Sequence, residues 1–228
     1  AVGLGVLQLS SQEGRVGDER IFRFCRGGEN LHLLLHPAAD LRRRLAPLMD
    51  NDPARIRCIN TVLLSFIGSP FLYYGDEIGM GDDVNRHDRN GVRTPMQWDD
   101  TANAGFTTGQ PWLAVNPAYP EVNAADQLDD PESVFSHYRR LIELRHTEPV
   151  VVDGDFTMLL PDHPQVYAFT RRLDDTELLV MVNVSSHPAE APLADSSRWH
   201  DAEVLLGEPY DPRMQPWAQR VLRRAVDD

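Results

Sequence analysis

The sequence contains no lysine, because all 22 of its basic residues are arginines. A P-loop requires a lysine against the phosphates, and Schiff-base catalysis requires a lysine amine, so both chemistries are excluded. Asp and Glu total 35, which gives a formal net charge of -13. This acidic balance disfavours nucleic acid and anionic membranes as partners and is compatible with a neutral substrate.

Cysteine is scarce, and no long apolar run is present. Cys25 and Cys58 lack CxxC spacing, so we expect neither a disulfide scaffold nor a zinc ribbon, and a reducing cytoplasm is the default location. The opening run AVGLGVLQLSS is short and has no basic flank, which fits neither a signal peptide nor a transmembrane span. The chain does not begin with methionine, so we expect it to be processed or cut from something longer.

The remaining composition is typical of a globular protein, with 42% hydrophobic and 25% charged residues. The length of 228 residues is enough for one large domain or two small ones. The most informative stretch runs from Tyr73 to Trp98, a glycine-punctuated loop rich in carboxylates, arginines and aromatics. The apolar run Phe71 to Tyr74 at its start is typical of a buried strand. Since α/β enzymes carry their sites on loops where such strands end, this loop is the candidate site.

Two helices are expected on either side of the loop. The first opens at Asp52, with Pro53 in its first position, and ends at Gly68. The second opens at 130–132 and ends near His146. Their apolar faces would consist of Ile56, Ile59, Leu63, Phe66 and Ile67 in the first helix and of Val134, Tyr138, Leu141 and Ile142 in the second. Residues 99–129 are expected to be irregular, and a loop of that length is usually functional or wrapped onto a neighbouring surface.

The pattern changes beyond Pro149. Short β-prone runs at 156–160, 166–171, 178–184 and 203–206 alternate with turn sequences such as Asp153-Gly154. We therefore expect a small antiparallel sheet or sandwich over 149–228, in which residues 212–228 form a last strand or a tail. Residues 1–40 stay unassigned, because 22–35 suits short strands as well as a helix.

Three motifs carry a resemblance to a known family: YYGDEIGM (73–80), DRNGVRTPMQW (88–98) and NAGF (103–106). Together they resemble the α-amylase superfamily, glycoside hydrolase family 13, over roughly residues 41–190. The resemblance implies an α/β fold, namely the remnant of a (β/α)8 TIM barrel followed by a small antiparallel β-sheet domain. The remnant, 41–148, would hold the last strand (71–74) and its flanking helices, and 149–228 would be the β domain. Nothing before Leu41 aligns with the family.

Two stretches resemble different members of one branch of this family. LRRRLAPL (41–48) and the helix through Asn60 resemble trehalose synthase, which interconverts maltose and trehalose. TTGQPW (107–112), with VNP (115–117), resembles the oligo-1,6-glucosidase type of α-glucosidase. We favour an α-glucosidase acting on α-linked gluco-oligosaccharides of the maltose and isomaltose class, with a trehalose synthase as the alternative.

The catalytic carboxylates of the family are missing. Retaining glycoside hydrolysis needs a nucleophilic carboxylate and a second carboxyl group of raised pKa about 5 Å away. The resemblance places these two after strands four and five, and a third Asp in an Asn-His-Asp motif after strand seven. The chain has no Asn-His-Asp, and the roughly 70 residues before its strand eight leave no room for strands four and five. We therefore expect no catalytic residue and no turnover by the chain alone.

Substrate contact is expected from arginines of the loop. In related α-glucosidases an arginine of this loop pairs with an Asp near the first strand and helps to recognise the non-reducing terminal glucose. A planar guanidinium also suits two sugar hydroxyls. The resemblance therefore makes Arg89 the first candidate for binding an α-linked glucose di- or oligosaccharide, and Arg93 the second.

The other polar residues are expected to shape the loop, which is the role given to Asp76, Glu77 and Gln97. Trp98 is expected to be a buried plug of the loop rather than a sugar platform, although it keeps the latter as an alternative. His87 is expected to be exposed.

No metal and no cofactor are expected. Asp82 and Asp83 form an acidic pair in the loop, but they lack backbone ligands and the recurring acidic spacing of a calcium site.

Two hypotheses of different classes follow. In the first, the chain is the C-terminal part of an α-glucosidase or trehalose synthase, and an N-terminal barrel portion is its partner. In the second, it is a non-catalytic carbohydrate-binding or interaction module. An upstream reading frame for the missing strands favours the first, and an intact gene boundary at Ala1 favours the second. Either way, an uncovered barrel strand at 71–74 should be prone to aggregation.

Overall fold

The computed structural model describes residues 23–27, 30–34, 43–83, 85–86 and 88–226, in two compact units. The β unit comprises residues 1–38, 61–69 and 143–228, and the loop unit comprises 39–60 and 70–142. Helices α2 (Pro53–Ser65) and α4 (Val134–Thr147) have residues in both units. Each helix in the described ranges is too short or too polar to cross a lipid bilayer.

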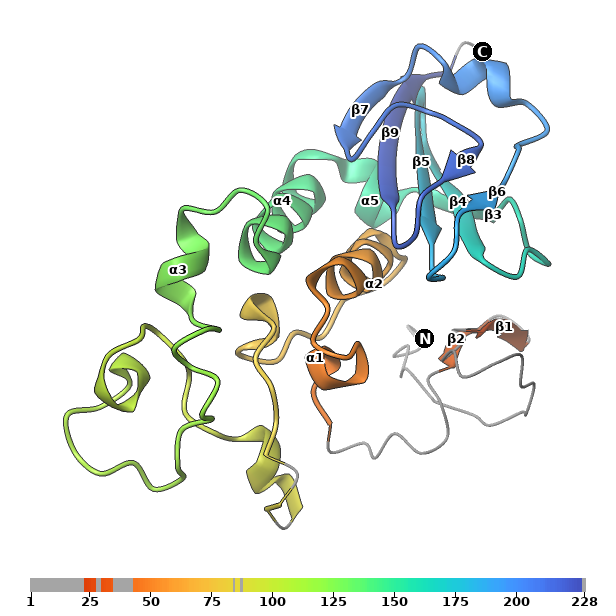
Figure 1. The fold of residues 1–228 in the computed structure, drawn as a ribbon. Helices are drawn as coiled ribbons and strands as arrows, with labels where there is room; N and C mark the ends of the chain where they lie inside the picture. The colour runs from red at the N-terminus through yellow and green to blue at the C-terminus, as the bar shows by residue number, and fades with distance from the viewer. Residues whose placement is uncertain (1–22, 28–29, 35–42, 84, 87, 227–228) are drawn as a thin grey trace. The chain divides into compact units, whose positions relative to one another are not determined.

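The β unit is built on a five-stranded antiparallel sheet in the order β3-β4-β5-β9-β7 (Figure 1). Its strands are β3 (Asp155–Met158), β4 (Val166–Leu173), β5 (Thr176–Asn183), β7 (Glu203–Leu206) and β9 (Gln219–Ala225). Two further antiparallel pairs join β6 (Ala189–Glu190) to β8 (Arg213–Met214) and β1 (Arg23–Gly27) to β2 (Asn30–Leu34). The antiparallel sheet predicted beyond residue 149 is confirmed, and the C-terminal segment proves to be strand.

The central strand β5 pairs with β4 and β9, and its side chains are buried on both faces of the sheet. Its residues alternate: Leu179 and Met181 pack with Trp199 of η4 (Ser196–Trp199), whereas Leu178 packs with Val150 and its neighbours. Val150 and Val151 lie on the short helix α5 (Pro149–Asp153), which the turn-rich sequence did not predict.

The end of α5 is held by Arg171, a side chain of β4 that is 1% exposed. Its guanidinium donates to the carbonyls of Val151 at 2.6 Å, Val152 at 3.3 Å and Gly154 at 2.6 Å. A helix end leaves its last carbonyls without intrahelical partners, and a cation is favourable there. Burial lowers the pKa of Arg171.

The loop unit has little regular structure apart from its helices. It contains α1 (Leu45–Leu48), η1 (Asp76–Ile78), η2 (Asp88–Val92), η3 (Ala102–Gly105) and α3 (Ala124–Leu128). One of its apolar clusters consists of Ile78, Met80 and Met96, against which Ala124 and Phe135 pack. The expected irregular course of 99–129 is therefore confirmed except at η3 and α3.

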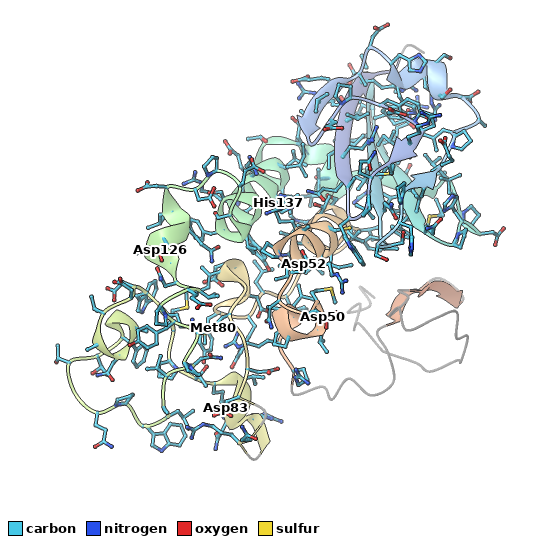
Figure 2. All side chains as sticks on the ribbon, viewed as in Figure 1. Asp50, Asp52, Met80, Asp83, Asp126 and His137 are labelled. Atoms are coloured by element: carbon cyan, nitrogen blue, oxygen red, sulfur yellow. The ribbon has the colours of Figure 1, made fainter. Side chains whose placement is uncertain are left out.

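The first predicted helix is confirmed with its cap. Asp50 and Asp52 lie in the turn between α1 and α2 (Figure 2). A carboxylate oxygen of Asp52 accepts from the backbone N–H groups of Ala54 at 2.8 Å and Arg55 at 3.3 Å, which are otherwise unpaired donors of the first turn. The helix ends at Ser65, so Phe66 and Ile67 lie beyond it.

The second predicted helix begins later than its sequence suggested. Asp130 accepts from the backbone N–H of Glu132 at 2.8 Å and so closes a turn rather than capping the helix. The cap is Ser133, whose hydroxyl accepts from the N–H of Ser136 at 3.0 Å. The Pro at 131 therefore lies before α4 and not in its first turn.

The predicted barrel strand at 71–74 is wrong as a strand. The segment is irregular and exposed: Phe71 is 77% and Leu72 is 47% accessible. A parallel strand is stabilised by neighbours that complete its hydrogen-bond ladder, and no strand of the described residues pairs with this segment.

Candidate functional site

The candidate loop is held at its base by Arg44, a residue that the sequence did not single out. Its side chain is 1% exposed. The guanidinium donates to the carbonyls of Tyr74 at 2.6 Å and Val92 at 2.8 Å and to the Asp76 carboxylate at 3.2 Å. It also lies 5.0 Å from the ring centroid of Tyr73 and 4.9 Å from that of Tyr74. One arginine therefore ties the two limbs of the loop together.

The turn at Gly75 makes this arrangement possible. Gly75 has a φ of 85°, and a Cβ there would lie 2.7 Å from the sulfur of Met80. The phenol of Tyr74 donates to the carbonyl of Thr94 at 2.9 Å, so the start of the loop is bonded to its later part as well.

Asp76, a predicted loop-shaping residue, lies on η1 beside Arg44. Burial raises the pKa of Asp76 to about 6, while the Arg44 guanidinium opposes this shift. Glu77 lies next to it on η1 and is partly buried. Tyr138 of α4 is 3% exposed, and burial together with the charges of Asp76 and Glu77 raises the pKa of its phenol. The Asp76 carboxylate is thus bonded to the arginine that ties the loop together, which is consistent with a loop-shaping residue.

The acidic pair further along the loop, Asp82 and Asp83, accepts hydrogen bonds from arginine side chains and backbone N–H groups. Asp82 accepts from Nε of Arg43 at 2.7 Å and from the backbone N–H of Arg44 at 3.1 Å. Asp83 accepts from Nε of Arg86 at 2.8 Å. Within the described ranges, no group of three or more His, Cys, Asp or Glu side chains fits a metal ion. These carboxylates shape the loop.

The two substrate-binding candidates are exposed on the loop. Arg89 lies on η2, and Arg93 follows its end. The described part of the chain gives neither side chain a hydrogen bond or an ion pair, whereas Arg43, Arg44 and Arg86 all have carboxylate partners. The loop thus brings Arg89 and Arg93 to its surface with their donors available. His87 lies outside the described residues.

Gln97 and Trp98 differ sharply in exposure. Gln97 is fully buried, and its side-chain amide N–H donates to the carbonyl of Val122. The backbone carbonyl of Gln97 accepts from the N–H of Ala124 at 2.9 Å. Trp98 is 53% exposed, so the expectation of a buried plug was wrong. The backbone of Trp98 is bonded on both sides, to Ala104 and Ala125 at 2.9 Å each, and this directs the indole outward from a fixed position.

Arg44 was missed because a sequence does not tell which member of an arginine run is buried. The informative pattern was the run Arg42-Arg43-Arg44 in a chain whose later loop carries many carboxylates. Two of its members pair with that loop, Arg43 with Asp82 and Arg44 with Asp76.

Two family models match consecutive parts of the chain. The alpha amylase catalytic domain matches residues 29–154, and the maltogenic amylase C-terminal domain matches residues 156–216. The chain belongs to the α-amylase family. The first match begins at residue 29, so the expectation that nothing before Leu41 aligns was wrong. That stretch holds β2, whose short run has no motif visible in a single sequence.

The relatives include both kinds of enzyme that the two stretches resemble. An oligo-1,6-glucosidase of Heyndrickxia coagulans is 38% identical over 185 residues, which is 66% of this chain and 33% of the relative. The trehalose synthase/amylase TreS of Mycobacterium tuberculosis is 40% identical over 168 residues, covering 70% of this chain and 28% of the relative.

A similar solved structure is the trehalulose synthase MutB from Pseudomonas mesoacidophila MX-45. It has a TM-score of 0.72 and 34% identity, over 79% of this chain and 41% of that one. The α-amylase family chain therefore spans less than half the length of these relatives. The predicted fold class, a TIM-barrel remnant followed by an antiparallel sheet, is confirmed, although residues 71–74 form no strand in it.

Proposed function

We propose that the chain is the C-terminal part of an α-glucosidase-type glycoside hydrolase that acts on α-linked gluco-oligosaccharides of the maltose and isomaltose class. The observation that carries this proposal is the loop from Tyr73 to Trp98. Its buried arginine is paired, whereas Arg89 and Arg93 are exposed without partners in the described residues. Oligo-1,6-glucosidases among the relatives support the same substrate class.

Under this proposal Arg89 and Arg93 contact the hydroxyls of a glucosyl unit. Each guanidinium offers several N–H donors in a fixed plane and no acceptor, which suits a pair of sugar oxygens. Asp76, Glu77 and Gln97 hold the loop in shape. The carboxylates that would break the glycosidic bond belong to an upstream barrel portion, so the chain is inactive alone. That portion would also cover Phe71 and Leu72, and we propose a cytoplasmic location for the whole protein.

A trehalose synthase is the second candidate. It is favoured by the 40% identity to the TreS of Mycobacterium tuberculosis over 70% of this chain. The two candidates differ in their products, because a synthase moves the glucosyl unit to a second glucose instead of to water.

The test uses the protein encoded by the reading frame extended upstream of Ala1. Isomaltose and maltose are supplied separately, and the products are separated by anion-exchange chromatography. We expect glucose from both sugars and a raised KM in Arg89→Ala, with Arg139→Ala as the control on the exposed side of α4. Trehalose formed from maltose would favour the synthase. An unchanged kcat/KM in Arg89→Ala would remove Arg89 from the binding role.

A further inference from the structure

The β unit has a pocket of its own, distinct from the candidate loop. Its volume is about 590 Å³, within the range of about 300–1,000 Å³ that is typical of small-molecule sites. It is lined by the start of β5, the end of β9, the start of β7 and the residues around η4. Its charged side chains are the three arginines Arg198, Arg223 and Arg224 and the three acids Asp175, Asp201 and Glu203. All of these residues belong to the β unit.

Much of the pocket wall is fixed by ion pairs. Arg223 donates to Glu148 and to Glu203, both at 2.5 Å. Arg224 donates to Glu177 at 2.6 Å, and its guanidinium lies 5.2 Å from the ring centroid of Trp199. A wall held in this way loses little freedom when a ligand binds.

Other groups in the wall have bonding capacity to spare. Arg198 stacks on Trp199 at 5.5 Å, and its contact with Glu177, at 3.6 Å, is an ion pair without a hydrogen bond. Asp201 is exposed and has no hydrogen bond or ion pair within the described part of the chain. The pocket therefore offers free donors on Arg198 and free acceptors on Asp201.

The charges of the pocket disfavour an anionic ligand. The lining contains three arginines and three carboxylates, those of Asp175, Asp201 and Glu203, and the Glu148 and Glu177 carboxylates are ion-paired with arginines of the lining. Five carboxylates against three guanidiniums leave an excess of negative charge, which repels an anion. Among the described residues, no cluster of three or more His, Cys, Asp or Glu side chains could hold a metal ion. A neutral molecule with several hydroxyl groups can donate to the carboxylates and accept from the guanidiniums at once.

We propose that this pocket is a second, non-catalytic binding site for a neutral α-linked gluco-oligosaccharide. One hydroxyl accepts from Arg198, and another donates to Asp201. The choice of sugar rests on the proposed function, whereas the choice of a neutral polyol rests on the pocket itself. The site would retain an oligosaccharide on the β unit independently of the loop carrying Arg89.

The test titrates the 228-residue chain with maltotriose and with isomaltotriose in an isothermal calorimeter. We expect saturable binding of at least one of the two at one site per chain. Asp201→Asn and Arg198→Gln should each weaken it about tenfold, the effect of losing a hydrogen bond to a charged group. The controls are Asp162→Asn and Arg172→Gln, exposed residues of the same unit outside the pocket, and they should bind like the parent. Thermal unfolding of each variant checks that Arg198→Gln leaves the fold intact.

The variants Arg89→Ala and Arg93→Ala separate this proposal from the function proposed for the loop. Binding lost in the Asp201 and Arg198 variants but kept in the loop variants supports the pocket. Binding lost only in the loop variants overturns the pocket proposal and supports the loop. Absence of binding by the parent chain overturns the pocket proposal too, while the loop proposal is decided separately by the extended protein's KM.

Discussion

At the scale of single residues, Arg44 holds the candidate loop in its conformation. Arg44→Ala should lower the free energy of unfolding by about 3 kcal/mol, because it leaves two carbonyls and the Asp76 carboxylate without their buried partner. Urea unfolding followed by circular dichroism measures the change. Arg139→Ala changes an exposed arginine that has no ion pair within the described part of the chain, and it should stay within about 0.5 kcal/mol. Equal losses in the two variants would show that Arg44 is not the anchor.

Asp76 gives the protein a distinctive pH dependence. Burial raises the pKa of Asp76 from 3.8 to about 6, so between these values the folded state binds a proton that the unfolded state has released. The resulting stabilisation is fully present below about pH 4 and is lost as pH rises through 6; it amounts to at most about 3 kcal/mol. Asp76→Asn should remove this part of the pH profile of unfolding. A profile identical to that of the parent would contradict the assignment.

Sequence reasoning at this scale predicted the environment of some residues and not of others. Arg89 and Arg93, the expected sugar contacts, are exposed on the polar loop, and their binding role stays a prediction. Gln97, expected to shape the loop, is buried there. Trp98 was wrongly expected to be buried, because its exposure depends on backbone hydrogen bonds to Ala104 and Ala125 that no local pattern reveals.

At the scale of elements, the end of α5 depends on one buried arginine of β4. Arg171→Met should cost about 3 kcal/mol, because the carbonyls of Val151, Val152 and Gly154 lose their donor while the apolar volume is nearly kept. The matched control is Arg172→Met, since Arg172 is the next residue of the same strand and is exposed. Thermal unfolding by calorimetry compares the two, and a larger loss in Arg172→Met would refute the capping role.

The irregular segment at 71–74 should govern the solubility of the chain. Phe71→Ser removes a side chain that is 77% exposed, so it should slow aggregation and change the free energy of unfolding by no more than about 0.5 kcal/mol. Light scattering during incubation at about 37 °C measures the aggregation. Phe106→Ser is the control, because Phe106 is 48% exposed but is not part of the apolar run. An equal slowing of aggregation by both variants would mean that residues 71–74 do not govern the solubility of the chain.

The elements themselves were largely predictable wherever local chemistry decides them. A proline after Asp52 and the apolar stripe behind it were enough for α2, and alternating runs between turn sequences were enough for β4 and β5. The strand expected at 71–74 failed for a non-local reason, since a strand needs partners and none of the described strands pairs with it. The short helix α5 depends on Arg171, which is distant from it in the sequence.

At the scale of the whole molecule, the chain combines a loop unit and a β unit, and each contains a buried apolar cluster. We propose that the exposed arginines of the loop unit contact sugar and that the β unit carries a further sugar site. Neither assignment includes a nucleophile, and the carboxylates of Asp76, Asp82 and Asp83 in the loop each pair with an arginine.

The most direct test of the central claim is an activity assay on the 228-residue chain by itself. The purified chain is incubated with isomaltose or maltose, and free glucose and trehalose are measured against a heat-inactivated sample. We predict no product above that control for either sugar, since we propose that the carboxylates that cleave or transfer the glucosyl unit belong to an upstream barrel portion. Glucose or trehalose formed in proportion to the amount of chain added would contradict it.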